Sequence, residues 1–299
     1  MGVHWKILCF LMLLLHKSSQ QEVFNDKNTL NLPANDKIGW METLDDDKLI
    51  STLTIPGTHD ALALYGGPFA KCQAWSLEDQ LKAGIRYFDL RVSGIELIIM
   101  HGWIYQGTSL SKVLATVKTF LTQFRTEVVL LRVKPVFLMK KKVQDLVEKI
   151  IRNDIWISEH SWVKESIPKI GEVRGKIVFV QKNTFKLGIK LFETDKKGDH
   201  EVTKVKDKEK KITQHLNEAA DQCKTGSALS LSYSSGTSLG TWKLVFLLPK
   251  KLAKEINPWL YGHLKTELGK KPKPCFGIIA MDFPGIDLIQ MVIKFKKAT

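Results

Sequence analysis

The sequence has few cysteines and lacks the spacings that usually hold a metal. Its 299 residues include four cysteines and eight histidines, but no Cys-x-x-Cys or His-x-x-x-His pair occurs. Because such pairs are typical of zinc sites, the sequence predicts none. A glycine-rich phosphate loop is also missing, and the glycines at 66–67 and 236–240 are turn signals.

No apolar run is long enough to cross a bilayer, and no linker rich in glycine, serine or proline divides the chain. Residues 1–6 form a short basic start, 7–15 an apolar run and 16–21 a polar exit, which is the order of a secretory signal peptide. We therefore predict a signal peptide at 1–20 and a secreted, extracellular protein; the alternative is a buried N-terminal helix. The basic stretch at 294–297 predicts no lipid anchor.

Cleavage of this signal would leave three cysteines, Cys72, Cys223 and Cys275. An odd number in an oxidising compartment predicts one disulfide and one free thiol. The sequence leaves all three pairings open.

The charge balance is strongly basic. The formal net charge is +14, or +12 once Lys6 and Lys17 leave with the signal. A basic surface favours anionic partners such as phospholipid headgroups, glycans or nucleic acid. Lysines alternate with acidic residues over 186–211, which indicates either a solvated face or a binding patch. Aromatic residues do not interleave with these lysines, so we do not expect nucleic acid as a partner.

Apolar runs alternate with helix-period segments through most of the chain. The predicted strands are 51–55, 85–92, 97–101, 128–134, 176–181, 228–233 and 277–282. The predicted helices are 43–49, 77–83, 110–123, 141–151, 211–222 and 249–256. Such alternation predicts a parallel sheet covered by helices. We therefore expect a single α/β domain, an irregular TIM-type barrel over 41–299 with one strand unassigned or absent, preceded by an extended arm at 21–40.

Polar side chains stand where predicted strands end, which is where a parallel barrel carries its chemistry. His59 and Asp60 follow the first strand, Arg91 ends the second, and His101 ends the third. Two histidines and an arginine suit acid and base attack on a phosphate diester without a metal. One histidine at a strand end usually only packs, but this combination favours catalysis. Asp282 would orient His59 in a closed barrel, or else cap a helix or form a surface ion pair.

Six motifs together resemble a known family. They are Thr54-Ile-Pro-Gly-Thr-His-Asp60, Phe88-Asp-Leu-Arg91, Met100-His-Gly102, Glu127-Val-Val-Leu-Leu-Arg-Val-Lys134, Arg174-Gly-Lys-Ile-Val-Phe-Val180 and Ile279-Ala-Met-Asp282. In order and spacing they are similar to the catalytic domain of phosphatidylinositol-specific phospholipase C of the secreted bacterial type. The resemblance runs over about 40–293, and the first three motifs carry its specificity.

The resemblance implies a distorted barrel that splits phosphatidylinositol into diacylglycerol and inositol 1,2-cyclic phosphate and then hydrolyses the cyclic product slowly. By motif position, His59 would deprotonate the inositol 2-hydroxyl with support from Asp282. His101 would protonate the departing glycerol oxygen. Arg91, held by Asp60, would stabilise the charge on phosphorus.

The substrate-binding residues that the resemblance implies are Asp89, Lys134, Arg174, Lys182 and Asp199. In the bacterial enzymes an Asp-x-Tyr pair grips the inositol ring, and its nearest counterpart here is Asp199-His-Glu201. A carboxylate in place of the aromatic ring predicts weaker stacking on the headgroup. That departure points to a glycosylated or otherwise modified inositol lipid, and the choice between free phosphatidylinositol and a glycosylphosphatidylinositol anchor stays open.

The same positions predict that no metal or other cofactor takes part. Intracellular eukaryotic relatives hold calcium with oxygen ligands where this sequence has Asp60, Arg91 and Lys134. A hard divalent cation would not share a site with two fixed positive charges. We therefore expect a metal-independent enzyme.

A lipid substrate also predicts peripheral contact with a membrane. Tyr65 and Phe69 follow the first catalytic motif, and Trp103 and Trp242 lie near strand ends. These aromatic side chains either face the lipid or pack inward. The sequence does not indicate an oligomeric state.

Two rival interpretations remain. One is a catalytically weak relative that binds anionic lipid or glycan through its basic face; such a binding protein has no need for both histidines. The other is a different barrel phosphodiesterase that holds magnesium or calcium in a carboxylate cluster. The Glu-x-Asp pair that those enzymes place after an early strand is not found.

Overall fold

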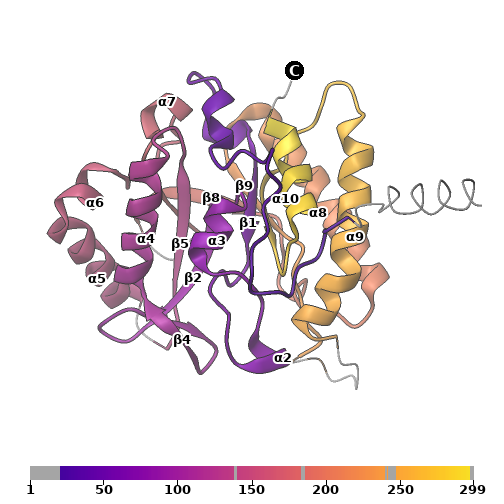
Figure 1. Ribbon diagram of the computed structural model, residues 1–299, viewed down its shortest axis with the longest axis horizontal. Helices are drawn as coiled ribbons and strands as arrows, with labels where there is room; N and C mark the ends of the chain where they lie inside the picture. The colour runs from indigo at the N-terminus through magenta and orange to yellow at the C-terminus, as the bar shows by residue number, and fades with distance from the viewer. Residues whose placement is uncertain (1–20, 138–139, 183–185, 240, 242–246, 297–299) are drawn as a thin grey trace, which may run out of the picture.

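The computed structural model describes residues 21–137, 140–182, 186–239, 241 and 247–296 (Figure 1). Seven of its strands pair in parallel in the order β1-β10-β9-β8-β7-β5-β2, and β2 pairs back with β1 to close a barrel. These strands are β1 (Thr54–Thr58), β2 (Tyr87–Ser93), β5 (Val129–Pro135), β7 (Ile177–Gln181), β8 (Ile189–Glu193), β9 (Leu229–Tyr233) and β10 (Gly277–Met281). The expected α/β barrel is therefore confirmed.

Three further strands lie outside the closed barrel. The strands β3 (Ile98–His101) and β4 (Ile104–Ser109) form an antiparallel hairpin that extends from β2, and the short β6 (Ser161–Trp162) pairs with β7. Figure 1 shows β4 and α2 at the lower edge of the molecule and α7 at the upper edge. The lower edge corresponds to the carboxyl ends of the barrel strands.

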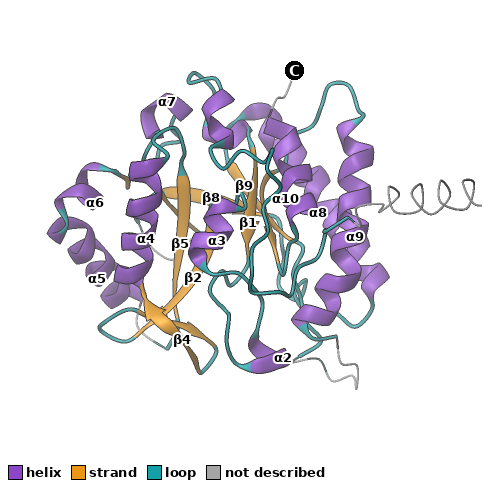
Figure 2. Ribbon diagram, viewed as in Figure 1, coloured by secondary structure: helices purple, strands orange, loops and turns teal. Residues whose placement is uncertain are grey.

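Helices cover the outside of the barrel (Figure 2). The α-helices are α2 (Gly67–Ala70), α3 (Leu77–Lys82), α4 (Leu110–Gln123), α5 (Lys140–Asn153), α6 (Ile155–Glu159), α7 (Ile170–Val173), α8 (Val205–Thr225), α9 (Pro249–Leu268) and α10 (Ile286–Ile293). The 3-10 helices are η1 (Trp40–Thr43), η2 (Ile50–Thr52) and η3 (Lys294–Lys296). In α4 the buried side chains include Leu110, Val113, Leu114, Val117 and Leu121, so one apolar stripe faces the barrel.

Most predicted elements are confirmed, two predictions are wrong, and several elements are additional. The expected helix over 43–49 is wrong: η1 and η2 flank a turn there, because the Arg174 guanidinium binds the carbonyl oxygens of Met41 and Leu44 at 3.1 and 2.7 Å. The predicted third strand, β3, is antiparallel and lies outside the barrel. The unassigned barrel strand is β8, and α10 is a further helix that the sequence did not predict; it is only eight residues long, too short for a periodic pattern to stand out.

The amino end of the barrel is fixed by a buried ion pair. Arg86 and Glu127 precede β2 and β5; both side chains are fully buried, and Arg86 Nη2 lies 2.7 Å from Glu127 Oε2. Arg86 also donates to the carbonyl oxygens of Leu81 and Ile85, and the ring of Phe120 lies 4.7 Å from its guanidinium. Such a fully hydrogen-bonded buried pair is costly to break, because removing one partner leaves an uncompensated charge.

The predicted arm at 21–40 runs as irregular chain along the outside of the barrel. Asn25 N donates to Phe283 O at 3.0 Å, and Glu22 N donates to Asp287 Oδ2 at 2.6 Å. The predicted signal peptide lies outside the described residues. Among the helices that the structure does describe, none combines the length and apolar character needed to cross a membrane.

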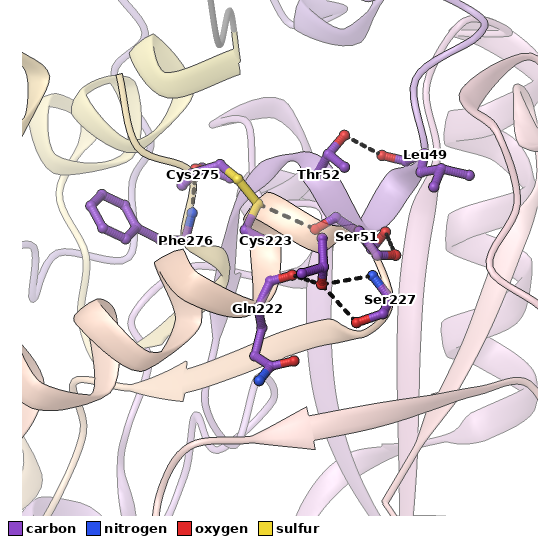
Figure 3. Close-up of a disulfide and its surroundings, with 11 residues drawn as sticks. Leu49, Ser51, Thr52, Gln222, Cys223, Ser227, Cys275 and Phe276 are labelled. Atoms are coloured by element: carbon purple, nitrogen blue, oxygen red, sulfur yellow. Dashed lines mark hydrogen bonds between the residues drawn. A yellow bond between two sulfur atoms is a disulfide. The ribbon is translucent and has the colours of Figure 1, made fainter. Parts of the chain in front are cut away.

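A disulfide joins Cys223 at the end of α8 to Cys275 just before β10 (Figure 3). The Cys72 thiol is free and buried. This pairing answers the question that the sequence left open. Cys223 Sγ also lies 3.4 Å from Ser51 O, ahead of β1. The bridge thus ties three segments together at the amino end of the barrel.

Replacing both bridge cysteines, Cys223→Ala with Cys275→Ala, should lower the free energy of unfolding by about 2–4 kcal/mol, because the bridge reduces the conformational entropy of the unfolded chain. The two cysteines are 52 positions apart, a long loop for such a constraint. Denaturant unfolding of the double variant and of the unaltered protein measures the difference. A reductant should not destabilise the double variant further, and an unchanged unfolding midpoint in it would contradict the stabilising role.

Candidate active site

The exit of β1 carries the first two site residues. Gly57 faces Tyr87 of β2 so closely that an added Cβ would lie 2.6 Å from the tyrosine ring, so only glycine allows β1 and β2 to pair there. Beyond this point the chain turns, with Asp60 at a φ of 40°. The turn directs both His59 and Asp60 into the interior, where their exposed fractions are 5% and 4%.

The His59 ring is held between two carboxylates. Its Nδ1 lies 3.0 Å from Asp282 Oδ1, and its Nε2 lies 3.4 Å from Asp60 Oδ2 and 3.3 Å from Arg91 Nη2. Gln73 fixes the backbone by donating to the carbonyl oxygen of His59 at 2.8 Å. The Asp282 contact leaves Nε2 as the ring atom that faces the cation and the cavity.

Asp60 gathers the remaining predicted catalytic groups. Arg91 Nε contacts Asp60 Oδ1, and His101 Nε2 lies 3.0 Å from Asp60 Oδ2. The Asp60 side chain is almost fully buried, whereas Arg91 and His101 keep 29% and 20% of their side-chain surface exposed. All five predicted catalytic residues therefore converge, with the cations open to solvent and the carboxylates beneath them.

Burial and charge oppose each other in this cluster. Burial alone would lower the pKa of His59, but the Asp60 and Asp282 carboxylates outweigh it and raise that pKa above its ordinary value. Burial alone would raise the pKa of Asp60, but the positive charges of Arg91 and His59 hold it well below the usual range. Asp60 is thus ionised at neutral pH, and His59 accepts a proton more readily than a free histidine.

A second group of charges lies beside the first. Asp89 Oδ2 lies 3.3 Å from Lys134 Nζ and accepts a hydrogen bond of 3.4 Å from the Tyr233 hydroxyl. Arg132 donates to that same hydroxyl at 2.7 Å. Burial lowers the pKa of Lys134, although Asp89 opposes the shift. Lys134 lines the cavity at this end of the barrel, whereas Asp89 is buried and is not part of the lining, although it contacts the lining residues Lys134 and Tyr233.

Of these groups, His59, Arg91, Lys134 and Tyr233 border a cavity of about 430 Å³ at the carboxyl end of the barrel. Its size falls in the range of small-molecule sites. Its lining includes His59, Arg91, Lys134, Lys182, Glu193, Asp195, Lys196, Lys197, Gly198, His200 and Tyr233. The predicted Lys182 is among them, and its Nζ lies 2.7 Å from Glu193 Oε2.

Three predicted substrate contacts are not part of the cavity lining: the buried Asp89, Arg174 and Asp199. Arg174 precedes β7 at the opposite, amino end of the barrel, where it binds backbone carbonyls and the Asp46 carboxylate, so its prediction as a headgroup contact is wrong. The Asp199 carboxylate turns away toward α8, where it binds Lys211 and His215 at 2.9 and 3.1 Å. The proposed counterpart of the inositol-gripping pair, Asp199-His-Glu201, is therefore in the wrong register, since the cavity is lined instead by Glu193 and Asp195 from the end of β8.

Several cavity residues are not predicted from the sequence: Glu193, Asp195, Lys196, Lys197, Gly198, His200 and Tyr233. Arg132, which donates to the Tyr233 hydroxyl from outside the lining, is not predicted either. Tyr233 ends a predicted strand in the same way as Arg91, so the signal existed for it. Glu193 and Asp195 had no such signal, because β8 itself was not predicted. The His200 ring lies 5.4 Å from the His59 ring, a contact between distant segments that no local pattern encodes.

The cluster offers oxygen and nitrogen atoms that could surround a cation. Ligand atoms of His59, Asp60 and Asp89 lie within 4.8 Å of one another. However, Arg91 binds Asp60 and Lys134 binds Asp89, so a divalent ion would have to displace a fixed positive charge from each carboxylate. The donor set therefore fits proton transfer and charge stabilisation better than metal binding.

Comparison with known proteins places this geometry in a family context. Residues 50–183 match the family model of the phosphatidylinositol-specific phospholipase C X domain. A 1-phosphatidylinositol phosphodiesterase of Listeria monocytogenes is 28% identical over 316 residues, which cover 97% of this chain and 96% of the relative. One of Staphylococcus aureus strain Newman is 30% identical over 152 residues, 46% of this chain and 49% of the relative.

Solved structures agree with the sequence matches. The phosphatidylinositol-specific phospholipase C from Listeria monocytogenes has a TM-score of 0.75 and 29% identity, covering 88% of this chain and 100% of that chain. A phosphatidylinositol-specific phospholipase C from Staphylococcus aureus has a TM-score of 0.71 at 20% identity, covering 88% of this chain and 100% of that chain, and supports the fold alone.

The Asp282→Asn variant should lower the pKa of His59, because it removes a carboxylate that stabilises the protonated ring. His59 would then lose its proton at a lower pH than in the unaltered protein. An NMR titration of the imidazole resonances measures this shift. The pKa of His263, which stacks on Trp259 of α9, should not change, and a His59 pKa that stayed the same or rose would contradict the assigned role of Asp282.

Proposed function

The chain belongs to the phosphatidylinositol-specific phospholipase C family, and from this we propose that it cleaves phosphatidylinositol into diacylglycerol and inositol 1,2-cyclic phosphate. The observation that carries the proposal is the convergence of His59, Arg91 and His101 on the Asp60 carboxylate. The two histidines can serve as base and acid, and the Arg91 cation can stabilise the charge that develops on the phosphate. This arrangement suits a phosphoryl transfer that needs both a base and an acid.

In the first step His59 Nε2 takes the proton of the inositol 2-hydroxyl. The freed oxygen attacks phosphorus, and Arg91 stabilises the negative charge that builds up on the phosphate oxygens. The bond from phosphorus to the glycerol oxygen breaks, and His101 gives that oxygen a proton. Asp282 stabilises the protonated His59 ring, as its 3.0 Å contact supports.

In the slower second step the histidines exchange roles. His101, now neutral, takes a proton from water, and the hydroxide attacks phosphorus. His59, now protonated, returns its proton to the inositol 2-oxygen as the ring of the cyclic phosphate opens. Each histidine thus ends one full cycle in its starting state, and no metal takes part in either step.

The nature of the lipid and the location of the protein are part of the same proposal. The cavity opens to the surface, so the substrate is either free phosphatidylinositol or an anchor in which the inositol carries a glycan. We propose that the protein is exported, since the Cys223–Cys275 disulfide suits an oxidising compartment. A catalytically weak relative that only binds anionic lipid or glycan is the second candidate, and the basic net charge favours it.

His59→Ala and His101→Ala should each reduce turnover of phosphatidylinositol vesicles by at least about 100-fold, because each removes a proton-transfer group. Release of cyclic inositol phosphate, followed by phosphorus NMR in the presence of a chelator, measures the rate. His263→Ala, on the outer helix α9, is the matched control and should retain full activity.

Three outcomes would count against this mechanism. Near-normal turnover in either variant would remove that histidine from its role. Activity that disappears in chelator and returns with calcium would refute the metal-independent steps. Tight vesicle binding by the unaltered protein, without any cyclic product, would favour the binding-only candidate.

Exposed hydrophobic side chains gather in the connections that follow the barrel strands, at the same end of the barrel as the cavity. Of the nine large ones in the described parts of the chain, seven lie in the connections from β1 to α3, β2 to α4, β5 to α5 and β9 to α9: Tyr65, Phe69, Ile95, Trp103, Tyr105, Phe137 and Leu239. Trp103 is 82% exposed and stacks on Phe137 with ring centroids 3.8 Å apart. We propose that this face contacts the membrane from which the lipid headgroup is drawn. Trp242, the other aromatic residue considered for this role, lies outside the described residues.

The double variant Tyr65→Ser with Phe69→Ser should weaken binding to phosphatidylinositol vesicles by about tenfold or more, because it removes apolar area that the lipid would cover. Both side chains are more than half exposed, so the fold should persist. Cosedimentation with vesicles measures the partition. Ile155→Ser, on α6 and even more exposed, is the control; unchanged binding by the double variant would rule out the segment of Tyr65 and Phe69 as a lipid contact.

A further inference from the structure

The loop between β8 and α8, residues 194–204, forms one wall of the cavity that His59 and Arg91 also border. Its contribution to the lining is Asp195, Lys196, Lys197, Gly198 and His200. Gly198 has a φ of 92°, which lets the chain turn sharply at this point. The two consecutive lysines therefore stand at the tip of the loop, beside the reaction centre.

Some of the lysine and arginine side chains that line the cavity form an ion pair with a carboxylate, and others do not. Three of them are paired: Arg91 with Asp60, Lys134 with Asp89, and Lys182 with Glu193. Lys196 and Lys197 are exposed, and within the described ranges their ammonium groups form no ion pair. Two positive charges are thus available in the cavity beyond those that hold the catalytic carboxylates.

Buried groups on α8 fix the position of this loop. His215 lies between two loop carboxylates, with Nδ1 3.3 Å from Asp195 Oδ1 and Nε2 3.1 Å from Asp199 Oδ2. The same Asp199 oxygen accepts a hydrogen bond of 2.8 Å from Lys196 N, and Asp195 accepts one of 3.0 Å from Tyr233 N. The backbone that carries the two lysines is therefore anchored on both sides, and less ordering of the loop is needed when the lysines bind an anion.

We propose that Lys196 and Lys197 form a second anion subsite, which binds a phosphate monoester carried on the inositol ring. This inference rests on the proposed function, because the reacting phosphodiester must occupy the region of Arg91 and His59. Lysine binds phosphate as a point charge, and two unpaired ammonium groups match the charge of a phosphate monoester. An amine-bearing sugar on the same ring would be repelled. The chain should therefore prefer a phosphorylated headgroup to a cationic glycosylated one.

The double variant Lys196→Gln with Lys197→Gln tests this subsite. Turnover is compared on phosphatidylinositol and on phosphatidylinositol 4-phosphate, each at the same low fraction in neutral vesicles. The ratio of kcat/KM for the phosphorylated lipid to that for the unphosphorylated lipid should fall by about tenfold in the variant, because charge-assisted bonds to the extra phosphate are lost. The matched control is Lys190→Gln with Lys210→Gln, which removes two exposed lysines outside the cavity lining.

Two results would overturn the subsite. An unchanged ratio in the Lys196/Lys197 variant would mean that these lysines do not recognise the ring phosphate. If the variant lost the same fraction of kcat/KM on both lipids, the two lysines would respond to membrane charge instead. The same conclusion would follow if the variant lost as much kcat/KM on phosphatidylinositol when the vesicles also contained phosphatidylserine. The control double variant should keep the ratio of the unaltered protein, and a fall in it as well would also assign the effect to overall charge.

A measurement without turnover separates this inference from the proposed function. Calorimetry compares the binding of inositol 1,4-bisphosphate with that of inositol 1-phosphate. A preference for the bisphosphate that disappears in the Lys196/Lys197 variant would support the subsite even if no lipid were cleaved. Equal affinity of the unaltered protein for both compounds would reject the subsite while leaving cleavage of phosphatidylinositol intact.

Discussion

One buried carboxylate organises the catalytic end of this barrel. Asp60 contacts Arg91, His59 and His101 from a position that is almost inaccessible to water. An isolated carboxylate there would be strongly unfavourable, so the burial of Asp60 and the clustering of the basic side chains depend on each other. The same contacts separate two histidines that would otherwise repel when protonated, and they leave Arg91 partly open to a ligand.

Barrel closure supplies the other half of this arrangement. Asp282 follows β10 and His59 follows β1, so the two are 223 positions apart in sequence yet 3.0 Å apart in space. The parallel register of β1 with β10 brings them together, and Gly57 lets β2 approach from the other side. The hydrogen bond between His59 and Asp282 therefore depends on closure of the barrel and cannot form within any local segment.

The sequence allowed a good prediction wherever a buried strand led directly into a polar side chain. The strands before His59, Arg91 and Asp282 are short, apolar and bounded by turn signals, so their ends could be located. β8 was missed because residues 187–193 mix lysine and acidic residues with the apolar ones, and Glu193 and Asp195 were missed with it. Arg174 and Asp199 were wrongly predicted to face the cavity. Arg174 precedes β7 and therefore lies at the amino end of the barrel, and the Asp199 carboxylate turns away to bind His215 on α8, a contact that is distant in sequence.

Stabilising features and chemistry occupy opposite ends of the same barrel. The Arg86–Glu127 pair and the Cys223–Cys275 bridge both lie where strands begin, whereas the cavity and its lysine-bearing loop lie where strands finish. Substitutions in the connecting loops at the catalytic mouth can therefore alter the choice of headgroup without weakening the scaffold. This separation would allow descendants of a common ancestor to diverge in lipid preference while the framework beneath them stayed the same.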